Sequence, residues 1–138
     1  MPKRIDWNKF RSALLEQLDK PYKFGAKWPL GDPNPQGPLD CSSLSRWAYS
    51  RVGIYIPEGS TAQFLASHPV DIAALGDLGF FRNDKGIHHV GILLGDEVID
   101  ARGDPYNKVI TRPRAKWEAW KEFTGWHRPD AVTKFELA

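Results

Sequence analysis

The chain contains a single cysteine, Cys41, and the residues around it suit a reactive thiol. Asp40 stands directly before it, and apolar residues then recur at helical spacing, which predicts a helix from Cys41 to about Val52 that Gly53 ends. A thiol in the first turn of a helix meets free backbone amides and the positive end of the helix dipole, and both favour the thiolate. A lone cysteine is also a common small apolar filler, and its position alone leaves both interpretations open.

A nucleophilic cysteine needs a base, and the sequence offers four histidines: His68, His88, His89 and His127. His68 stands at the end of a predicted helix and His127 near the C-terminus, so a surface or structural role is favoured for both. His88 and His89 open an apolar strand, "HHVGILL". Because neighbours on a strand point to opposite faces, only one of these two can face Cys41.

A carboxylate on the following strand could orient that histidine. A two-residue hairpin turn at Gly95-Asp96 would place Asp100 diagonal to His89, and such cross-strand neighbours lie roughly 7–8 Å apart. A three-residue turn would instead put Asp100 on the opposite face of the sheet. Asp100 interrupts the buried-strand pattern "VIDA", where an acid needs a partner unless it faces solvent at a sheet edge.

The order of the elements predicts an α+β fold in which the helices pack on one face of a mainly antiparallel sheet. Helices are expected over Asp6–Asp19 and, from a capping-box pattern at Ser60 and Gln63, over a short segment that Pro69 follows. The Gly- and Pro-rich segment 25–38 is typical of a long ordered loop, and it leads directly to Cys41. Strands are expected over 77–81, 89–95, 97–101, 108–112 and 123–128, with a helical turn over 117–122.

Length and composition limit the remaining choices. With 138 residues the chain is expected to form a single domain over 1–138, and a net charge of +2 with scattered basic residues argues against nucleic acid as a partner. One cysteine cannot form an internal disulfide or a cysteine-based zinc site. No stretch is long enough to span a membrane, and the N-terminal residues lack the apolar core of a signal peptide, so we expect a soluble protein synthesised in the cytoplasm.

Several ordered segments together resemble a known family, the NlpC-type papain-like cysteine peptidases of the cell wall. The resemblance covers residues 21–128 and rests on an aromatic-glycine segment, an Asp-Cys-Ser helix start, a Gly-Asp-Leu strand entry and a His-Val-Gly-Ile strand. These segments are "PYKFGAKWP" (21–29), "DCSSLSRWAYSRVGIYIP" (40–57), "LGDLGFF" (75–81) and "HVGILLGDEVIDARG" (89–103).

The resemblance implies a papain-like fold and a role for each matching residue. It implies that Cys41 is the nucleophile, His89 the general base and Asp100 the residue that orients the imidazole. It implies no metal and no cofactor. Four further positions match residues that line the site or hold the substrate peptide, often by its free amino end: Tyr22, Asp40, Ser42 and Ser60.

Three positions depart from the family pattern. Ser43 replaces the usual glycine after Cys-Ser, so we expect a narrower floor of the groove. Ala26 replaces the second glycine of the aromatic-glycine segment, and Glu58 stands where relatives often have a basic residue. These changes bear on peptide specificity and leave the catalytic trio intact.

The function implied by the resemblance is hydrolysis of amide bonds in peptidoglycan stem peptides, commonly between D-glutamate and a diamino acid. The sequence does not give the oligomeric state, and a monomer is favoured. An acyltransferase or deamidase on the same fold and a non-catalytic virion or cell-wall binding module are the alternatives. A compact catalytic domain of this kind suits a phage lysin, a phage tail component or a toxin carried by a secretion device, acting on the wall after lysis or delivery. Packing is favoured over sugar binding for the C-terminal tryptophans: Trp117, Trp120 and Trp126.

Overall fold

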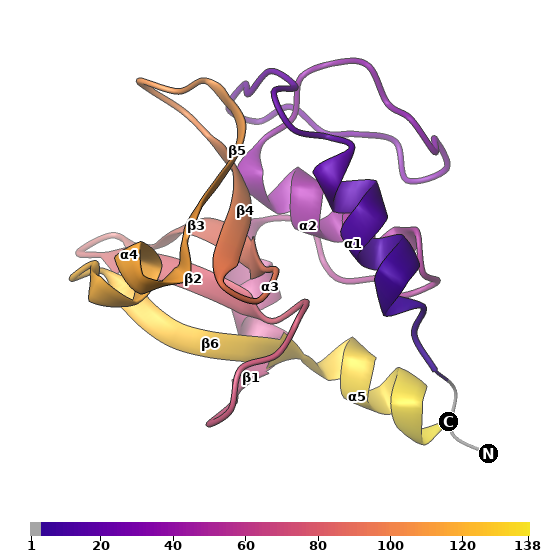
Figure 1. Ribbon diagram of the computed structural model, residues 1–138. Helices are drawn as coiled ribbons and strands as arrows, with labels where there is room; N and C mark the ends of the chain where they lie inside the picture. Colours follow the sequence, from indigo (N-terminus) through magenta and orange to yellow (C-terminus); the bar gives the residue numbers. More distant parts are fainter. Residues whose placement is uncertain (1–3) are drawn as a thin grey trace.

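The computed structural model describes residues 4–138 and consists of helices and one antiparallel sheet with strands of different lengths (Figure 1). The helices are α1 (Trp7–Leu15), α2 (Cys41–Ser50), α3 (Ser60–Leu65), α4 (Arg114–Ala119) and α5 (Asp130–Leu137). The strands are β1 (Ser67–Pro69), β2 (Leu78–Asn83), β3 (Gly86–Leu93), β4 (Glu97–Arg102), β5 (Lys108–Pro113) and β6 (Phe123–Pro129). The strand order is β1-β6-β2-β3-β4-β5 and every pair is antiparallel, so the α+β prediction is confirmed.

The main core lies between the sheet and the N-terminal helices. Figure 1 shows α1 and α2 side by side on one side of the strands. On α2 the residues Leu44, Trp47 and Ala48 recur at helical spacing, and all three are fully buried. Burial of a large apolar side chain such as that of Leu44 stabilises a fold by about 1.5–3 kcal/mol, so these contacts hold α2 against the sheet.

A smaller core lies on the other face of the sheet, where α4 packs. The indole of Trp117, on α4, lies over Gly79 and Gly91, which face each other on β2 and β3. A Cβ atom at Gly91 would overlap this ring, so glycine is required for the close approach. Helices were predicted on one face only, and α4 on the second face was not foreseen. The sequence pattern does not show that Gly79 and Gly91 pair across two strands and make room for the Trp117 indole.

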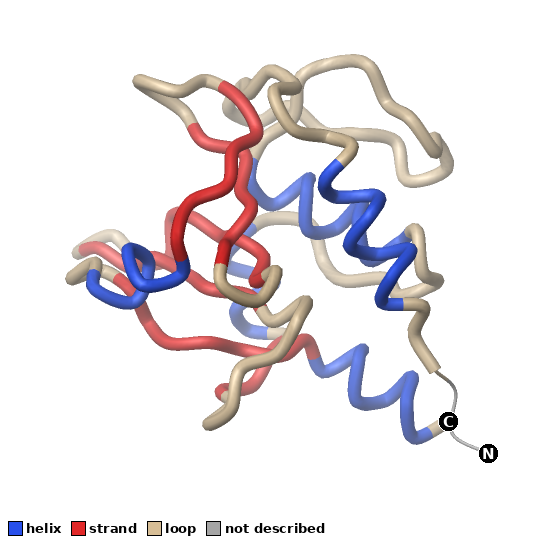
Figure 2. Tube along the Cα trace, viewed as in Figure 1, coloured by secondary structure: helices blue, strands red, loops and turns tan. Residues whose placement is uncertain are grey.

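The segment between α1 and α2 is a long loop, drawn in tan in Figure 2, and it confirms the predicted loop over 25–38. It is held in place by two hydrogen bonds from one tryptophan. The backbone N–H of Trp28 donates to Ser43 Oγ at 2.8 Å, and its indole N–H donates to the Gly37 carbonyl at 2.7 Å. The loop is therefore ordered, and it leads directly to Cys41.

Two short elements were not predicted, and one predicted cap was wrong. Strand β1 has only three residues, too few for an alternating pattern, and α5 follows a proline at the C-terminal end. At α3 the N-cap is Gly59, and Ser60 is already the first helical residue. The side chain of Gln63 turns inward instead of back to the helix start, because it bonds to Ser45 Oγ at 2.6 Å.

Candidate active site

The predicted nucleophile lies at the first position of α2. The Oδ1 atom of Asp40 accepts a hydrogen bond from the Ser43 amide at 2.9 Å, which caps the helix directly before Cys41. The Cys41 side chain is partly exposed. The thiol therefore stands where the free amides and the helix dipole favour a negative sulfur, as the sequence predicts.

The two other members of the predicted trio are in direct contact. His89 Nε2 lies 2.6 Å from Asp100 Oδ2, and the Asp100 side chain is completely buried. The hairpin that joins β3 to β4 has the two-residue turn on which this contact depends, since the Leu94 amide donates to the Glu97 carbonyl. The prediction that Asp100 lies diagonal to His89 and finds a partner there is confirmed.

Arg102 also bonds to the carboxylate, and sequence reasoning missed it. Its Nε donates to the same oxygen, Asp100 Oδ2, at 2.9 Å. Two cationic partners on one buried carboxylate offset the cost of removing its charge from water. A signal was available, because Arg102 lies two residues after Asp100 on one strand and therefore shares its face.

The electrostatic surroundings favour the protonated form of His89. Burial would lower the pKa of His89, but hydrogen bonds and charge interactions with Asp100 and Cys41 outweigh it and raise the pKa to about 9. Because Nε2 is engaged by Asp100, Nδ1 is the ring nitrogen left for the sulfur. The contacts therefore favour the imidazolium form of His89, with Asp100 bonded to one ring nitrogen and Cys41 beside the other.

The ring of His89 is also held by aromatic contacts. It stacks on Phe81, with centroids 5.5 Å apart and planes inclined by 28°, and on Trp117 at 5.7 Å and 29°. The guanidinium of Arg102 lies 5.6 Å from the Trp117 ring. Four buried side-chain polar atoms lack a hydrogen-bond partner in the described part of the chain, and three belong to Asp100, Arg102 and Trp117. Unsatisfied buried groups of this kind gather at functional sites.

Tyr22 lies beside the thiol, as predicted. Its backbone pairs with Leu39 just before the helix cap, and its N–H donates to the Asn107 carbonyl at 2.9 Å. Burial, and then the charges of Cys41 and Asp40, raise the pKa of the Tyr22 hydroxyl. The phenol therefore stays protonated and can donate a hydrogen bond beside the sulfur.

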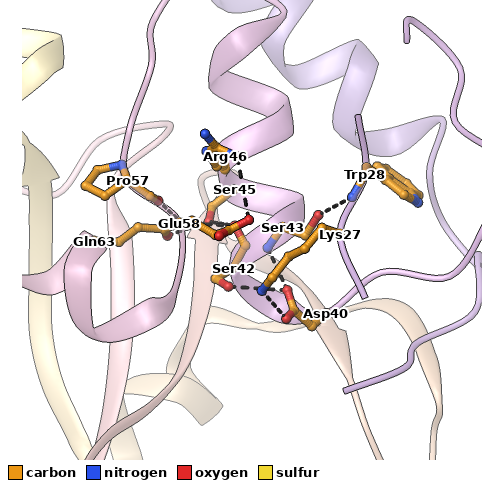
Figure 3. A network of polar contacts seen from close by, with 10 residues as sticks. All are labelled: Lys27, Trp28, Asp40, Ser42, Ser43, Ser45, Arg46, Pro57, Glu58 and Gln63. Atoms are coloured by element: carbon orange, nitrogen blue, oxygen red, sulfur yellow. Dashed lines mark hydrogen bonds and ion pairs between the residues drawn. The ribbon is translucent and has the colours of Figure 1, made fainter. Parts of the chain in front are cut away.

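The predicted substrate-binding residues Asp40 and Ser42 lie in a polar network, which Figure 3 shows. Lys27 Nζ contacts Asp40 Oδ2 at 2.5 Å, and Ser42 Oγ donates to Asp40 Oδ1 at 3.3 Å. Both carboxylate oxygens are therefore engaged within the chain. A substrate amine could use Asp40 only by sharing it with Lys27, which sequence reasoning missed because the loop carrying Lys27 has no periodic pattern.

The departures from the family pattern also lie in this region. Ser43 is buried and its Oγ accepts from the Trp28 amide, so it anchors the loop and does not narrow the groove; that expectation was wrong. The carbonyl of Ala26 accepts from the Asp40 amide at 2.9 Å. Glu58 is exposed and lies 3.8 Å from Arg46 (Figure 3).

Two hollows open on either side of the trio. The Cys41 hollow, of about 550 Å³, is lined by residues that include Cys41, Asp40, Ser42 and Ser60. The His89 hollow, of about 680 Å³, is lined by residues that include His89, Arg102, Arg112, Lys116, Trp117 and Trp120. Tyr22 and His88 line both hollows, so the two hollows adjoin at these residues. Six of the seven predicted site residues therefore line one of these hollows, and the seventh, Asp100, bonds to His89.

The remaining histidines are engaged elsewhere. His88 Nε2 lies 2.8 Å from Glu122 Oε1, and His68 Nδ1 lies 2.7 Å from Asp130 Oδ1. His127 is buried against Phe64, with ring centroids 4.9 Å apart.

Among residues 4–138, no three His, Cys, Asp or Glu side chains are close enough together to hold a metal ion. No helix in that range is long and apolar enough to cross a membrane.

Known proteins share both the sequence pattern and the fold. The model of the NlpC/P60 family matches residues 19–126. A probable endopeptidase p60 of Listeria grayi is 34% identical over 90 residues, which are 63% of this chain and 16% of that protein. The chain spans only 16% to 36% of the length of the curated relatives it matches.

Solved structures of related domains superimpose on most of the chain. The peptidoglycan hydrolase RipB of Mycobacterium tuberculosis is 28% identical, with a TM-score of 0.71 over 90% of this chain and 64% of that chain. RipD of the same organism, described as a non-catalytic NlpC/p60 domain adapted to peptidoglycan binding, is 19% identical. It has a TM-score of 0.70 over 91% of this chain and 97% of that chain. At this identity, the likeness to RipD concerns the fold alone.

Proposed function

Because the chain belongs to the NlpC/P60 family, we propose that it is a cysteine endopeptidase that hydrolyses amide bonds in peptidoglycan stem peptides. The observation that carries the proposal is the buried contact between His89 and Asp100 next to Cys41 at the start of α2. A module that only binds has no need of a buried carboxylate that orients an imidazole toward a thiol. The names of the relatives, which include endopeptidases and a peptidoglycan hydrolase, support the substrate class.

The first chemical step follows from the charge state of the pair. The Cys41 thiolate attacks the carbonyl carbon, and the carbonyl oxygen takes the negative charge. The backbone amide of Cys41 and the Tyr22 hydroxyl, which burial keeps protonated, are the donors that we assign to this oxygen. The C–N bond then breaks, the leaving amine takes a proton from His89, and a thioester to Cys41 remains.

The second step returns the enzyme to its starting state. Neutral His89 accepts a proton from water as the water oxygen attacks the thioester carbon. The C–S bond breaks, the carboxylic acid product leaves, and the thiolate regains its imidazolium partner. Asp100 keeps Nε2 engaged throughout, which fixes the tautomer and holds Nδ1 toward the sulfur.

We further propose that the bond cleaved joins D-glutamate to the amine of a diamino acid. We also propose that residues 1–138 act as one monomeric domain, which reaches the cell wall after lysis or through a phage or secretion device. The Cys41 hollow would hold the acyl part of the peptide, with Tyr22, Ser42 and Ser60 in its wall. Asp40, whose carboxylate Lys27 already neutralises, would contribute mainly by capping α2.

The test is incubation of the protein and of Cys41→Ala with synthetic stem peptides and with intact peptidoglycan, read by mass spectrometry. We expect new amine-ended fragments from the parent protein and none from Cys41→Ala, with both proteins giving the same circular dichroism spectrum. An oxygen-18 label from water in the acid product distinguishes hydrolysis from acyl transfer. Cleavage that survives Cys41→Ala, or transfer of the acyl group to an added amine without label, would overturn the proposal.

A further inference from the structure

The two hollows are lined by different members of the trio, and this difference indicates how a bound peptide would be oriented. His89 lines only the larger hollow, and Cys41 lines only the smaller one. Because His89 must protonate the leaving amine, the part of the substrate that carries this amine lies on the His89 side of the scissile bond. The acyl part stays attached to the sulfur on the Cys41 side.

Two basic side chains in the wall of the His89 hollow have no ion-pair partner among the described residues. They are Arg112 and Lys116. The guanidinium of Arg112 lies 5.9 Å from the centre of the Tyr106 ring. The two acids in the wall are Glu122, which bonds to His88, and Asp104, which accepts from Asn107 at 2.9 Å.

Arg102, which is paired with Asp100, also lines this hollow. Its Nε donates to Asp100, and its side chain is 18% exposed where it lines the hollow. The Trp117 ring, which is almost fully buried, lies 5.6 Å from this guanidinium, and half-exposed Trp120 also lines the hollow. A ligand that enters here meets cationic groups beside aromatic surface, which is the combination that receives a carboxylate on a short carbon chain.

We propose that the His89 hollow binds the amine-side residue of the substrate through a free carboxylate, held by Arg112 and Lys116. The inference rests on the proposed function, because it deepens the specificity of the same site. The ligand is a peptide fragment whose residue at the leaving amine carries a carboxylate that is not amidated. A neutral sugar is the competing occupant, since exposed Trp120 offers a stacking face, but a sugar would not need two unpaired cations.

The test uses two stem peptides that differ only in this carboxylate, free in one and amidated in the other. We expect the parent protein to cleave the free form with a kcat/KM about ten-fold or more higher, as for a charge-assisted hydrogen bond. In the double variant Arg112→Gln, Lys116→Gln this preference should fall to near one. Lys85→Gln removes a charge from the turn between β2 and β3, lines neither hollow, and should keep the parent preference.

A binding measurement separates this inference from the proposed function. Titration calorimetry of Cys41→Ala with the amine-side fragment alone, free or amidated, requires no hydrolysis. Tighter binding of the free form, lost in the double variant, supports the inference even if no peptide is cleaved. Equal binding of the two fragments, a preference that survives the double variant, or tight binding of a neutral sugar at the same place would overturn it.

Discussion

Replacing Asp100 by asparagine tests whether the carboxylate holds His89 in its protonated form. The substitution keeps the size of the side chain and removes its charge. The folded protein raises the pKa of His89 from 6.5 to about 9, a net stabilisation of the imidazolium on the order of 3 kcal/mol despite burial. Asp100 and Cys41 share this effect, so losing one charged partner should lower the pKa by roughly 1 to 2 units.

The measurable consequence is a shift of the alkaline limit of activity. In the parent protein kcat/KM should decline as the pH rises through about 9, because His89 then loses the proton that the leaving amine needs. In Asp100→Asn the same decline should begin roughly 1 to 2 pH units lower. The rate at the optimum should also fall, by about 10²-fold or more, because the ring is no longer held in one tautomer.

Two assays follow this shift. One is the pH profile of kcat/KM on a stem peptide, and the other is the rate at which iodoacetamide alkylates the chain's single cysteine, read as a mass increase. Asp96→Asn is the matched control, because it removes an exposed carboxylate from the turn of the same hairpin. An unchanged alkaline limit in Asp100→Asn, in a protein that melts like the parent, would refute the assignment of Asp100.

Three further outcomes can be checked. Lys27→Met should lower KM several-fold for peptides with a free amino end, because it frees the carboxylate of Asp40. The KM for the N-acetylated forms should not change. Equal changes for both kinds of peptide would contradict this. Gly91→Ala should destabilise the fold by about 1–3 kcal/mol in urea titration, because the new methyl overlaps the α4 indole, whereas Gly31→Ala, which meets no atom, should be near neutral. Because folding raises the pKa of His89, its contribution to the free energy of unfolding should be complete below pH 6.5 and lost as the pH rises through about 9.

The parts of the site that depend on local rules could be predicted from the sequence. An aspartate before an apolar helical pattern fixed the start of α2 and hence the place of Cys41. A two-residue turn set the register of β3 and β4, and with it the contact between His89 and Asp100. Both predictions concern residues whose partners lie within a few positions or on the next strand.

Features that depend on packing between distant segments could not be predicted. Nothing in the loop pattern shows that Lys27 reaches Asp40, because irregular backbone has no period from which to read direction. The capping-box pattern at Ser60 failed because Gln63 found a better partner inside the protein, in α2. Propensity is a weak guide where a tertiary hydrogen bond competes with a local one.

The trio is divided between two layers of the fold, and this predicts the order in which the protein fails on heating. His89 and Asp100 belong to adjacent strands of one sheet, whereas Cys41 belongs to a helix that rests on that sheet through apolar side chains. If α2 shifted relative to the sheet, the Cys41 sulfur would move away from the His89 imidazole although the helix and the strands remained folded. Loss of activity should therefore precede loss of the circular dichroism signal, and a crosslink between α2 and β3 should bring the two temperatures together.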